Sequence, residues 1–256
     1  MTLHQHHQQI SHSNPQPAVP FPLTTLGATL DLPLLPRQIA QFRGAVVEAF
    51  GQEYDLLHNH DNETESALDS PPNIPTAYHY RYPLVHYRTW QGRATLFGVE
   101  AGVPLLREFL LRTAQLTLGG QTLPLRIHWL REQEWALHMT DQPCTYRLMD
   151  YLPFHQENYA RWLSAPDLRS RIELLEEILV GHILGLASAV GWRLPQRLEV
   201  QLLHIRDTRP VTIHRHRRMA FNLIFRANIA LPPGIALGRS VAFGFGVMLP
   251  TNDTPQ

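Results

Sequence analysis

The chain has 256 residues and a balanced charge, with 22 basic and 22 acidic side chains, and every basic residue is an arginine. A hydrophobic content of 44% with a mean hydropathy of −0.20 excludes a wholly disordered chain. No apolar run reaches the roughly 18 residues that a membrane span needs. We therefore expect a soluble globular protein with one large or two small domains and no membrane partner.

The cysteine content and the N-terminal composition favour the cytoplasm. Cys144 is the only cysteine, so neither an intramolecular disulfide nor a zinc-thiolate site is available. The first residues are rich in His, Gln, Ser, Asn and Pro, and they lack the apolar core of a signal peptide. We expect residues 1–19 to form a disordered tail.

The first half of the chain mixes strand and helix patterns. Alternating or helically spaced apolar residues predict, in order, a strand at 26–32, a helix from about Pro36 to Gly51, strands at 78–90 and 93–99, a helix at 103–112, and strands at 114–118 and 122–130. Gln91-Gly92 is typical of a tight hairpin turn. The order β-α-β-β-α-β is the ferredoxin-like arrangement.

The second half begins after a polar turn predicted near residues 131–134. Its patterns predict strands at 135–139 and 146–154, helices at 158–164 and 167–190, strands at 198–205, 211–216 and 221–229, a glycine-bearing segment at 234–246, and a strand at 247–249. Asp167 is the expected N-cap of the long helix. Two α+β units in tandem are therefore predicted, at residues 20–132 and 133–256.

Charge is segregated along the sequence. Residues 48–69 hold seven acids and no arginine, whereas residues 193–239 hold nine arginines against Glu199 and Asp207. Clustered arginines favour a polyanion, because guanidinium groups bind phosphates with two donors and stack on bases. Nucleic acid is the leading partner, and a solvated strand surface is the alternative.

Two histidines, His58 and His60, stand two positions apart before Asp61. They could serve as general base and general acid for attack of an RNA 2′-hydroxyl on its own phosphodiester, without a metal. With Asp61 they could instead form the metal site of a hydrolase. A third interpretation is that one histidine only caps a turn in a polar loop.

The C-terminal segment 231–248 carries four glycines, at positions 234, 238, 244 and 246. Glycines allow backbone amides to approach phosphates closely, and Arg239 lies between them. The alternative is a glycine-rich turn between strands, with Phe243 and Phe245 in the core.

Several segments resemble the CRISPR-associated endoribonucleases that cut precursor crRNA within its repeats, the Cas-six family, and most of all its b subgroup. These segments are Phe42-Arg43-Gly44, Leu56-Leu57-His58-Asn59-His60, 80–85, 98–102, 156–159, 221–232, Leu237-Gly238-Arg239 and Gly244-Phe245-Gly246. The matches run in order from about residue 24 to residue 249, and the C-terminal ones are the most specific.

The resemblance implies an α+β fold of tandem ferredoxin-like (RRM-like) domains with a C-terminal glycine-rich loop. It also implies metal-independent cleavage of CRISPR repeat RNA without a cofactor, giving a 2′,3′-cyclic phosphate and a 5′-hydroxyl. Association with other CRISPR effector subunits and pairing of two copies stay open. The alternatives are a cleavage-inactive repeat-RNA-binding subunit of the same fold and the metal hydrolase described above.

The resemblance assigns His58, His60 and Arg239, and the reaction chemistry and the clustered arginines suggest the other site residues. His58 and His60 match the catalytic position, and we favour His60 as the principal residue. Arg43 and Arg81 are candidate transition-state stabilisers. The expected RNA-binding residues are Arg239, Gly238, Gly244, Gly246, Arg215, Arg217 and Arg218. The chain departs from the family pattern in three places: Arg239 where lysine is frequent, His86 where glutamine is usual, and about twenty extra residues between Asp61 and Tyr80.

Overall fold

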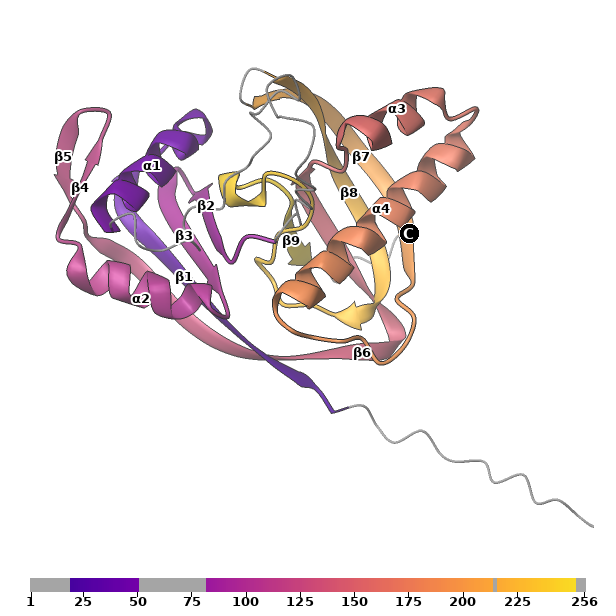
Figure 1. The fold of residues 1–256 in the computed structure, drawn as a ribbon, viewed down its shortest axis with the longest axis horizontal. Helices are drawn as coiled ribbons and strands as arrows, with labels where there is room; N and C mark the ends of the chain where they lie inside the picture. Colours follow the sequence, from indigo (N-terminus) through magenta and orange to yellow (C-terminus); the bar gives the residue numbers. More distant parts are fainter. Residues whose placement is uncertain (1–18, 51–81, 214–215, 252–256) are drawn as a thin grey trace, which may run out of the picture.

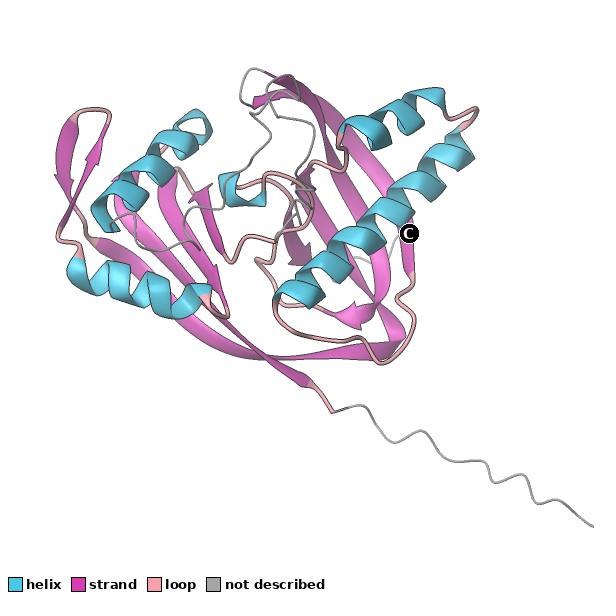
Figure 2. Ribbon diagram, in the orientation of Figure 1, coloured by secondary structure: helices cyan, strands magenta, loops and turns pink. Residues whose placement is uncertain are grey.

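The computed structural model describes residues 19–50, 82–213 and 216–251. They form two halves, each with helices packed on an antiparallel sheet (Figures 1 and 2). The predicted disordered tail lies outside the described residues, except for Val19. Within the described ranges, no helix is both long and apolar enough to cross a membrane.

The first half follows the predicted order closely. Its elements are β1 (Phe21–Pro33), the short helix η1 (Pro36–Gln38), α1 (Ile39–Phe50), β2 (Val85–Trp90), β3 (Arg93–Val99) and α2 (Gly102–Arg112). The hairpin turn between β2 and β3 is confirmed, since Gln91 and Gly92 both have positive φ, at 50° and 73°. The strand predicted at 78–90 begins only at Val85 in the described part of the chain.

The fourth strand of this sheet differs from the prediction. The strand expected at 114–118 and the beginning of the one expected at 122–130 form a separate two-stranded sheet, β4 (Gln115–Leu118) with β5 (Gln121–Pro124), whereas residues 127–130 belong to the next strand. The chain leaves this hairpin at Leu125, whose amide donates to the carbonyl of Ala114. The next strand, β6 (Ile127–Tyr151), then pairs with β1 and completes the sheet.

The polar turn predicted at 131–134 is wrong, because β6, which is 25 residues long, continues through these positions as a strand. Arg131 pairs with Gly27, and Glu132 pairs with Leu26. The side chains of Arg131 and Glu132 are exposed. Polar side chains are tolerated here because this stretch of strand is solvated. The strand expected at 135–139 and residues 146–151 of the one expected at 146–154 are parts of the same strand, which ends at Tyr151 and joins the two halves (Figure 1).

The second half contains α3 (Gln156–Ser164), α4 (Leu168–Ala189), β7 (Val200–Ile213), β8 (His216–Ala230), the short helix η3 (Val241–Phe243) and β9 (Val247–Pro250). The Asp167 cap is confirmed, since its carboxylate accepts a hydrogen bond from the Ser170 amide at 2.8 Å. The two strands predicted between residues 198 and 216 are one strand, β7. Pro210 does not interrupt it, because β7 is an edge strand.

Both halves have the same strand order. In the first half the order is β6-β1-β3-β2, and in the second it is β9-β6-β8-β7. β6 therefore serves as the last strand of one unit and the first strand of the next. This is a tandem ferredoxin-like arrangement, as predicted. The expected boundary at 132/133 falls inside β6, and we keep the division at that point as a proposal.

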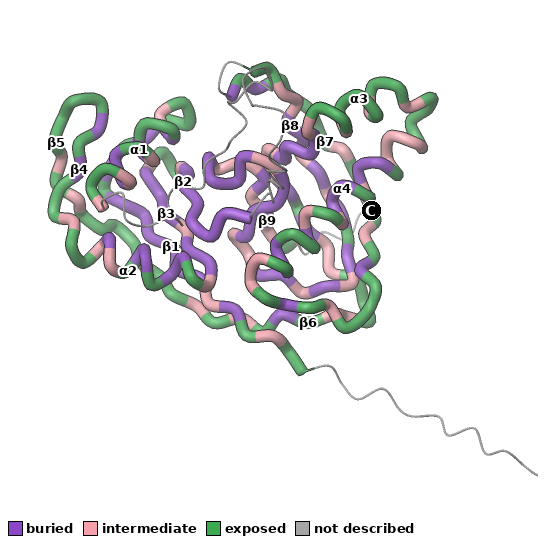
Figure 3. The backbone as a smooth tube through the Cα atoms, viewed as in Figure 1, coloured by how far each residue is buried: buried purple, intermediate pink, exposed green. Residues whose placement is uncertain are grey.

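The second unit departs from the ferredoxin pattern at its second crossover. Where a helix would lie between its third and fourth strands, the chain has an irregular stretch that includes η3. We call it the 231–246 segment. Most of its residues are buried (Figure 3). Apolar residues of this segment enter the cores of both halves, including Leu237 in the second and Phe243 in the first.

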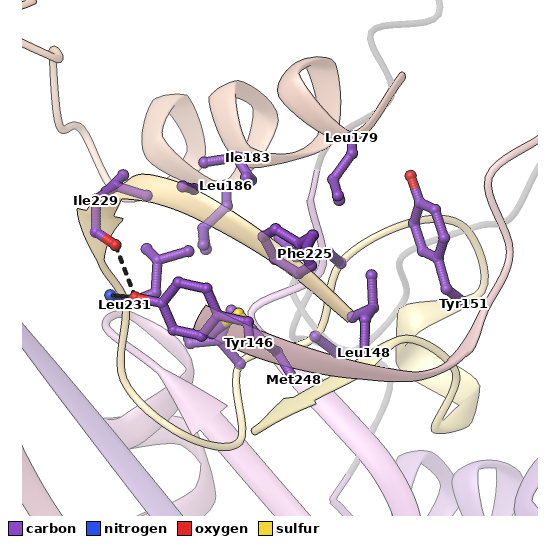
Figure 4. Close-up of a cluster of buried hydrophobic side chains, with 14 of the residues drawn as sticks. Tyr146, Leu148, Tyr151, Leu179, Ile183, Leu186, Phe225, Ile229, Leu231 and Met248 are labelled. Carbon is purple, nitrogen blue, oxygen red and sulfur yellow. Dashed lines mark hydrogen bonds between the residues drawn. The ribbon is translucent and has the colours of Figure 1, made fainter. Parts of the chain in front are cut away.

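A buried tyrosine holds the start of this segment. The Tyr146 hydroxyl donates to the Ile229 carbonyl at 2.6 Å and accepts from the Leu231 amide at 2.9 Å (Figure 4). Burial raises the pKa of Tyr146. Around it, Leu179, Ile183 and other side chains of α4 cover the sheet and close the larger core (Figure 4).

Candidate nucleic-acid interface

The structure describes only part of the predicted site. His58, His60, Arg81 and Arg215 lie outside the described residues, and so does Asp61 of the metal alternative. Their placement and roles stay predictions. The described candidates are Arg43, Arg217, Arg218, Arg239, Gly238, Gly244 and Gly246.

The three glycines have a packing function that the sequence did not reveal. A Cβ on Gly238 would lie 2.7 Å from the Tyr151 ring, and one on Gly246 would overlap the Leu237 carbonyl. All three have positive φ, at 103° for Gly238, 83° for Gly244 and 68° for Gly246. Close backbone packing therefore requires glycine at these positions, and direct contact with RNA stays a prediction.

Arg43 connects the first half to the 231–246 segment. It projects from α1, and its guanidinium lies over the Phe243 ring at 5.0 Å from the ring centre. Phe243 is buried, as the structural alternative for this segment expected. A guanidinium over a ring contributes about 0.5–1 kcal/mol at a partly exposed site. A role for Arg43 in the transition state stays a prediction.

Three predicted RNA-binding arginines meet in one pocket. Arg217 and Arg218 of β8 line a hollow of about 570 Å³ together with Arg239 of the 231–246 segment. His155 and His216 line it as well, and we call it the basic pocket. The sequence analysis missed His155, whose Nδ1 accepts from the Asn158 amide at 3.5 Å and caps α3.

A partly buried histidine, His182, lies within the electrostatic reach of the basic pocket. The Tyr151 hydroxyl and His182 Nδ1 are 2.7 Å apart. Burial, followed by the charges of Arg239 and His155, lowers the pKa of His182 to about 4. His182 is therefore neutral at neutral pH, and the positive field that lowers its pKa would attract an anion.

A second, larger hollow of about 770 Å³ lies between the two halves. Among the described residues that line it, five are arginines and one is an aspartate: Arg88, Arg93, Arg131, Arg147, Arg209 and Asp150. We call it the arginine groove. Two of its arginines are neutralised, because Arg93 pairs with Asp31 and Arg209 pairs with Asp150 at 2.8 Å. The remaining excess of positive charge suits a polyanion.

The wall of the groove contains a buried arginine, Arg88, which is 8% exposed. Its Nη2 donates to His86 Nδ1 at 3.1 Å and to the Gly234 carbonyl at 3.0 Å, and its guanidinium lies over the Phe97 ring. Burial lowers the pKa of Arg88 to about 10. Arg88 thereby ties β2 to the 231–246 segment, and no described carboxylate forms an ion pair with it.

His86 supports this arginine in its neutral form. Burial, followed by the Arg88 charge, lowers the pKa of His86 to about 3. Because Arg88 can only donate, Nδ1 of His86 must accept, and its Nε2 donates to the Pro83 carbonyl at 2.9 Å. Sequence reasoning noted His86 only as a departure from the family pattern.

The fold and the two hollows define a class: an α+β protein of tandem ferredoxin-like units with arginine-rich surfaces suited to nucleic acid. Family models identify the particular family. The Cas6b N-terminal domain matches residues 21–136, and the Cas6b C-terminal domain matches residues 138–251. The chain belongs to the Cas6b family, which confirms the resemblance to the b subgroup of CRISPR-associated endoribonucleases.

Solved structures show the same fold. A crystal structure of Cas6b is 19% identical with a TM-score of 0.75, and a CRISPR RNA processing endoribonuclease Cas6b is 17% identical with a TM-score of 0.66. Each alignment covers 90% of this chain and 100% of the other. An uncharacterized protein of Methanocaldococcus jannaschii is 24% identical over 143 residues, which are 56% of this chain and 96% of that protein.

Proposed function

We propose that the protein is a metal-independent endoribonuclease that cleaves precursor crRNA within CRISPR repeats. Membership of the Cas6b family supports the reaction class. The observation that carries the proposal is that three candidate RNA-binding arginines line one basic pocket: Arg239, which the resemblance assigns to RNA, and Arg217 and Arg218, which belong to a cluster of basic residues. Residues about twenty positions apart in the sequence therefore form one anion-binding surface.

In the proposed reaction, the 2′-hydroxyl upstream of the scissile phosphate is the nucleophile. A histidine acting as general base removes its proton, and the oxygen attacks the adjacent phosphorus. The bond to the 5′-oxygen breaks, and a second histidine acting as general acid protonates that oxygen. The products are a 2′,3′-cyclic phosphate and a 5′-hydroxyl, so the step consumes no water, and the two histidines move the protons without a metal. We assign these roles to His58 and His60, with His60 as the principal residue.

The arginines have a different task, since they cannot exchange protons at neutral pH. Arg217, Arg218 and Arg239 would bind phosphates of the repeat, and Arg43 or Arg81 would stabilise the charge on the pentacoordinate phosphorus. General acid and base catalysis contribute about 10² to 10⁴ each, which suffices for an enzyme that needs few turnovers.

The test measures cleavage of the cognate repeat RNA in EDTA by the wild type, His58→Ala, His60→Ala and the double variant. We expect the wild type to cut, the double variant to be inactive, and a 2′-deoxy nucleotide at the attacking position to prevent cutting. Undiminished cutting by the double variant would refute the catalytic assignment. Inactivation of the wild type by EDTA would support the metal hydrolase, and binding without cutting would support the inactive RNA-binding subunit.

The stoichiometry of the complex with the same RNA tests whether the protein assembles with other subunits or with a second copy. We propose CRISPR repeat RNA as the partner, and association with effector subunits or with a second copy follows only if the complex is larger than one protein and one RNA. Light scattering of the protein with a 2′-deoxy repeat RNA gives this stoichiometry directly.

A further inference from the structure

The sheet of the first half has one face without helices, and the pairing register shows which side chains share it. Directly paired residues on neighbouring antiparallel strands point to the same side. One row across β2, β3, β1 and β6 is Arg88, Thr95, Thr29 and Trp129. The next row on the same face is His86, Phe97, Gly27 and Arg131.

The 231–246 segment covers only part of this face. It packs on the β2 and β3 end, where His86 and Arg88 are buried and Arg88 donates to the Gly234 carbonyl. The β6 end stays open, and there Trp129 is 48% exposed and lines the arginine groove. A second tryptophan, Trp90 at the end of β2, is 54% exposed and lines the same groove.

The indole of Trp129 lies over a position that has no side chain. A Cβ on Gly27 would lie 2.9 Å from Cζ3 of Trp129, closer than such contacts allow. Glycine at this place in β1 therefore lets the ring lie against the sheet. A large aromatic surface left in contact with water in a groove is characteristic of a binding site.

Positive charges line the same groove as the two indoles. Arg131 follows Trp129 by two residues on β6 and faces the same side, and Arg147 lines the groove further along that strand. Both are exposed, and neither forms an ion pair with a described residue. Exposed aromatic rings beside unpaired arginines match the alternating bases and phosphates of a single strand.

We propose that the arginine groove binds an unpaired stretch of the RNA by stacking bases on Trp129, at its open β6 end, and on the exposed Trp90 at the end of β2. Arg131 and Arg147 bind the phosphates of that stretch. The proposal rests on the proposed function and adds to it, because it assigns single-stranded RNA to this groove. A paired base has both faces covered by its neighbours in the helix, whereas an unpaired base can stack on an indole.

The experiment measures fluorescence anisotropy of a labelled twelve-nucleotide oligouridylate with the full chain. Trp129→Ala should weaken binding about 5- to 150-fold, because one stacked base contributes about 1–3 kcal/mol. Trp129→Phe should retain most of the affinity, since it keeps a stacking ring. Leu130→Ala is the matched control, because Leu130 is 51% exposed on the same strand and faces the other side.

The outcomes separate this proposal from the proposed function. Equal binding by the wild type and Trp129→Ala would overturn the stacking proposal, and so would a wild type that cleaves its repeat hairpin but does not bind oligouridylate. If the wild type neither binds nor cleaves any repeat RNA, the proposed function itself is wrong. Quenching of tryptophan fluorescence by oligouridylate, reduced in Trp129→Ala, is the result expected from stacking.

Discussion

The two halves of the molecule have the same strand order but close their sheets differently. The first half packs two helices, α1 and α2, on one face of its sheet. The second half has a long helix, α4, and the 231–246 segment in place of a second crossover helix. A helix pairs its backbone N–H and C=O groups with one another, whereas the backbone groups of an irregular segment need specific partners elsewhere in the fold. The second half should therefore be far more sensitive to small changes in that segment.

The largest expected effect is that of Gly246→Ala. The new Cβ would overlap the Leu237 carbonyl, and φ at this position is 68°, so the segment cannot keep its path. We expect a loss of at least about 3 kcal/mol in the free energy of unfolding, measured by urea denaturation.

Gly44→Ala is the matched control in the first half. Gly44 lies in α1, with nothing within 4 Å of its Cβ position. Alanine is a better helix former than glycine, so stability should rise by about 0.5–1 kcal/mol. If both substitutions had the same effect, the contrast between the two halves would be lost.

The next effect concerns the hydroxyl that holds the start of the segment. Tyr146→Phe removes one atom and leaves the Ile229 carbonyl and the Leu231 amide without this buried partner. We expect a loss of about 1–3 kcal/mol in unfolding free energy. Tyr159→Phe, at an exposed tyrosine of α3, should change the same measurement by less than about 0.5 kcal/mol. A neutral Tyr146→Phe would contradict the anchoring role.

The third prediction concerns the pH dependence of stability. It tests the link between β2 and the 231–246 segment that Arg88 forms with the support of His86. The pKa of His86 is about 3 in the folded chain against about 6.5 in the unfolded chain, so the unfolded chain takes up the proton first as the pH falls. Stability should therefore fall below about pH 6.5, by at most about 1.4 kcal/mol per pH unit from this residue.

His86→Gln should flatten this pH dependence, because glutamine can accept from Arg88 and donate to Pro83 without becoming charged. Urea denaturation at pH 4, 5, 6 and 7 measures both slopes. Parallel slopes for the two proteins would show that His86 is not protonated on unfolding in this range.

The smallest effect concerns the charge of the arginine groove. Arg147→Ala should weaken binding of the 2′-deoxy repeat RNA modestly and reduce the slope of log affinity against log salt by about one. Arg112→Ala, at an exposed arginine of α2 that pairs with Glu108, should leave the slope unchanged. Identical slopes for Arg147→Ala and the wild type would show that Arg147 does not contact an RNA phosphate.

Local signals predicted much of the fold. Helical spacing located α2 and α4, Asp167 marked the start of α4, and Gln91-Gly92 marked the hairpin. The continuity of β6 escaped prediction, because Arg131 to Glu134 are polar in sequence and the pairing that holds them in a strand comes from β1, about a hundred residues earlier. Propensity reports local preference, whereas that pairing is a tertiary interaction.

The candidate site was predictable where the family resemblance or the clustered arginines marked it. Arg217, Arg218 and Arg239 line one pocket, and their binding to RNA stays a prediction. Arg88 and Trp129 escaped notice, because their place in one row across the sheet depends on the register of four strands. The packing of Gly246 against Leu237 depends on the path of the whole segment, which a glycine spacing does not reveal.

The most direct test of the central claim is the single-turnover cleavage rate of the cognate repeat RNA in EDTA, with analysis of the product ends. We predict cutting at one phosphodiester by the wild type, a 2′,3′-cyclic phosphate on the upstream product, and a loss of at least about 10²-fold in His60→Ala. A 3′-hydroxyl or an uncyclised phosphate from the first turnover, or full activity of the variant lacking both His58 and His60, would contradict it.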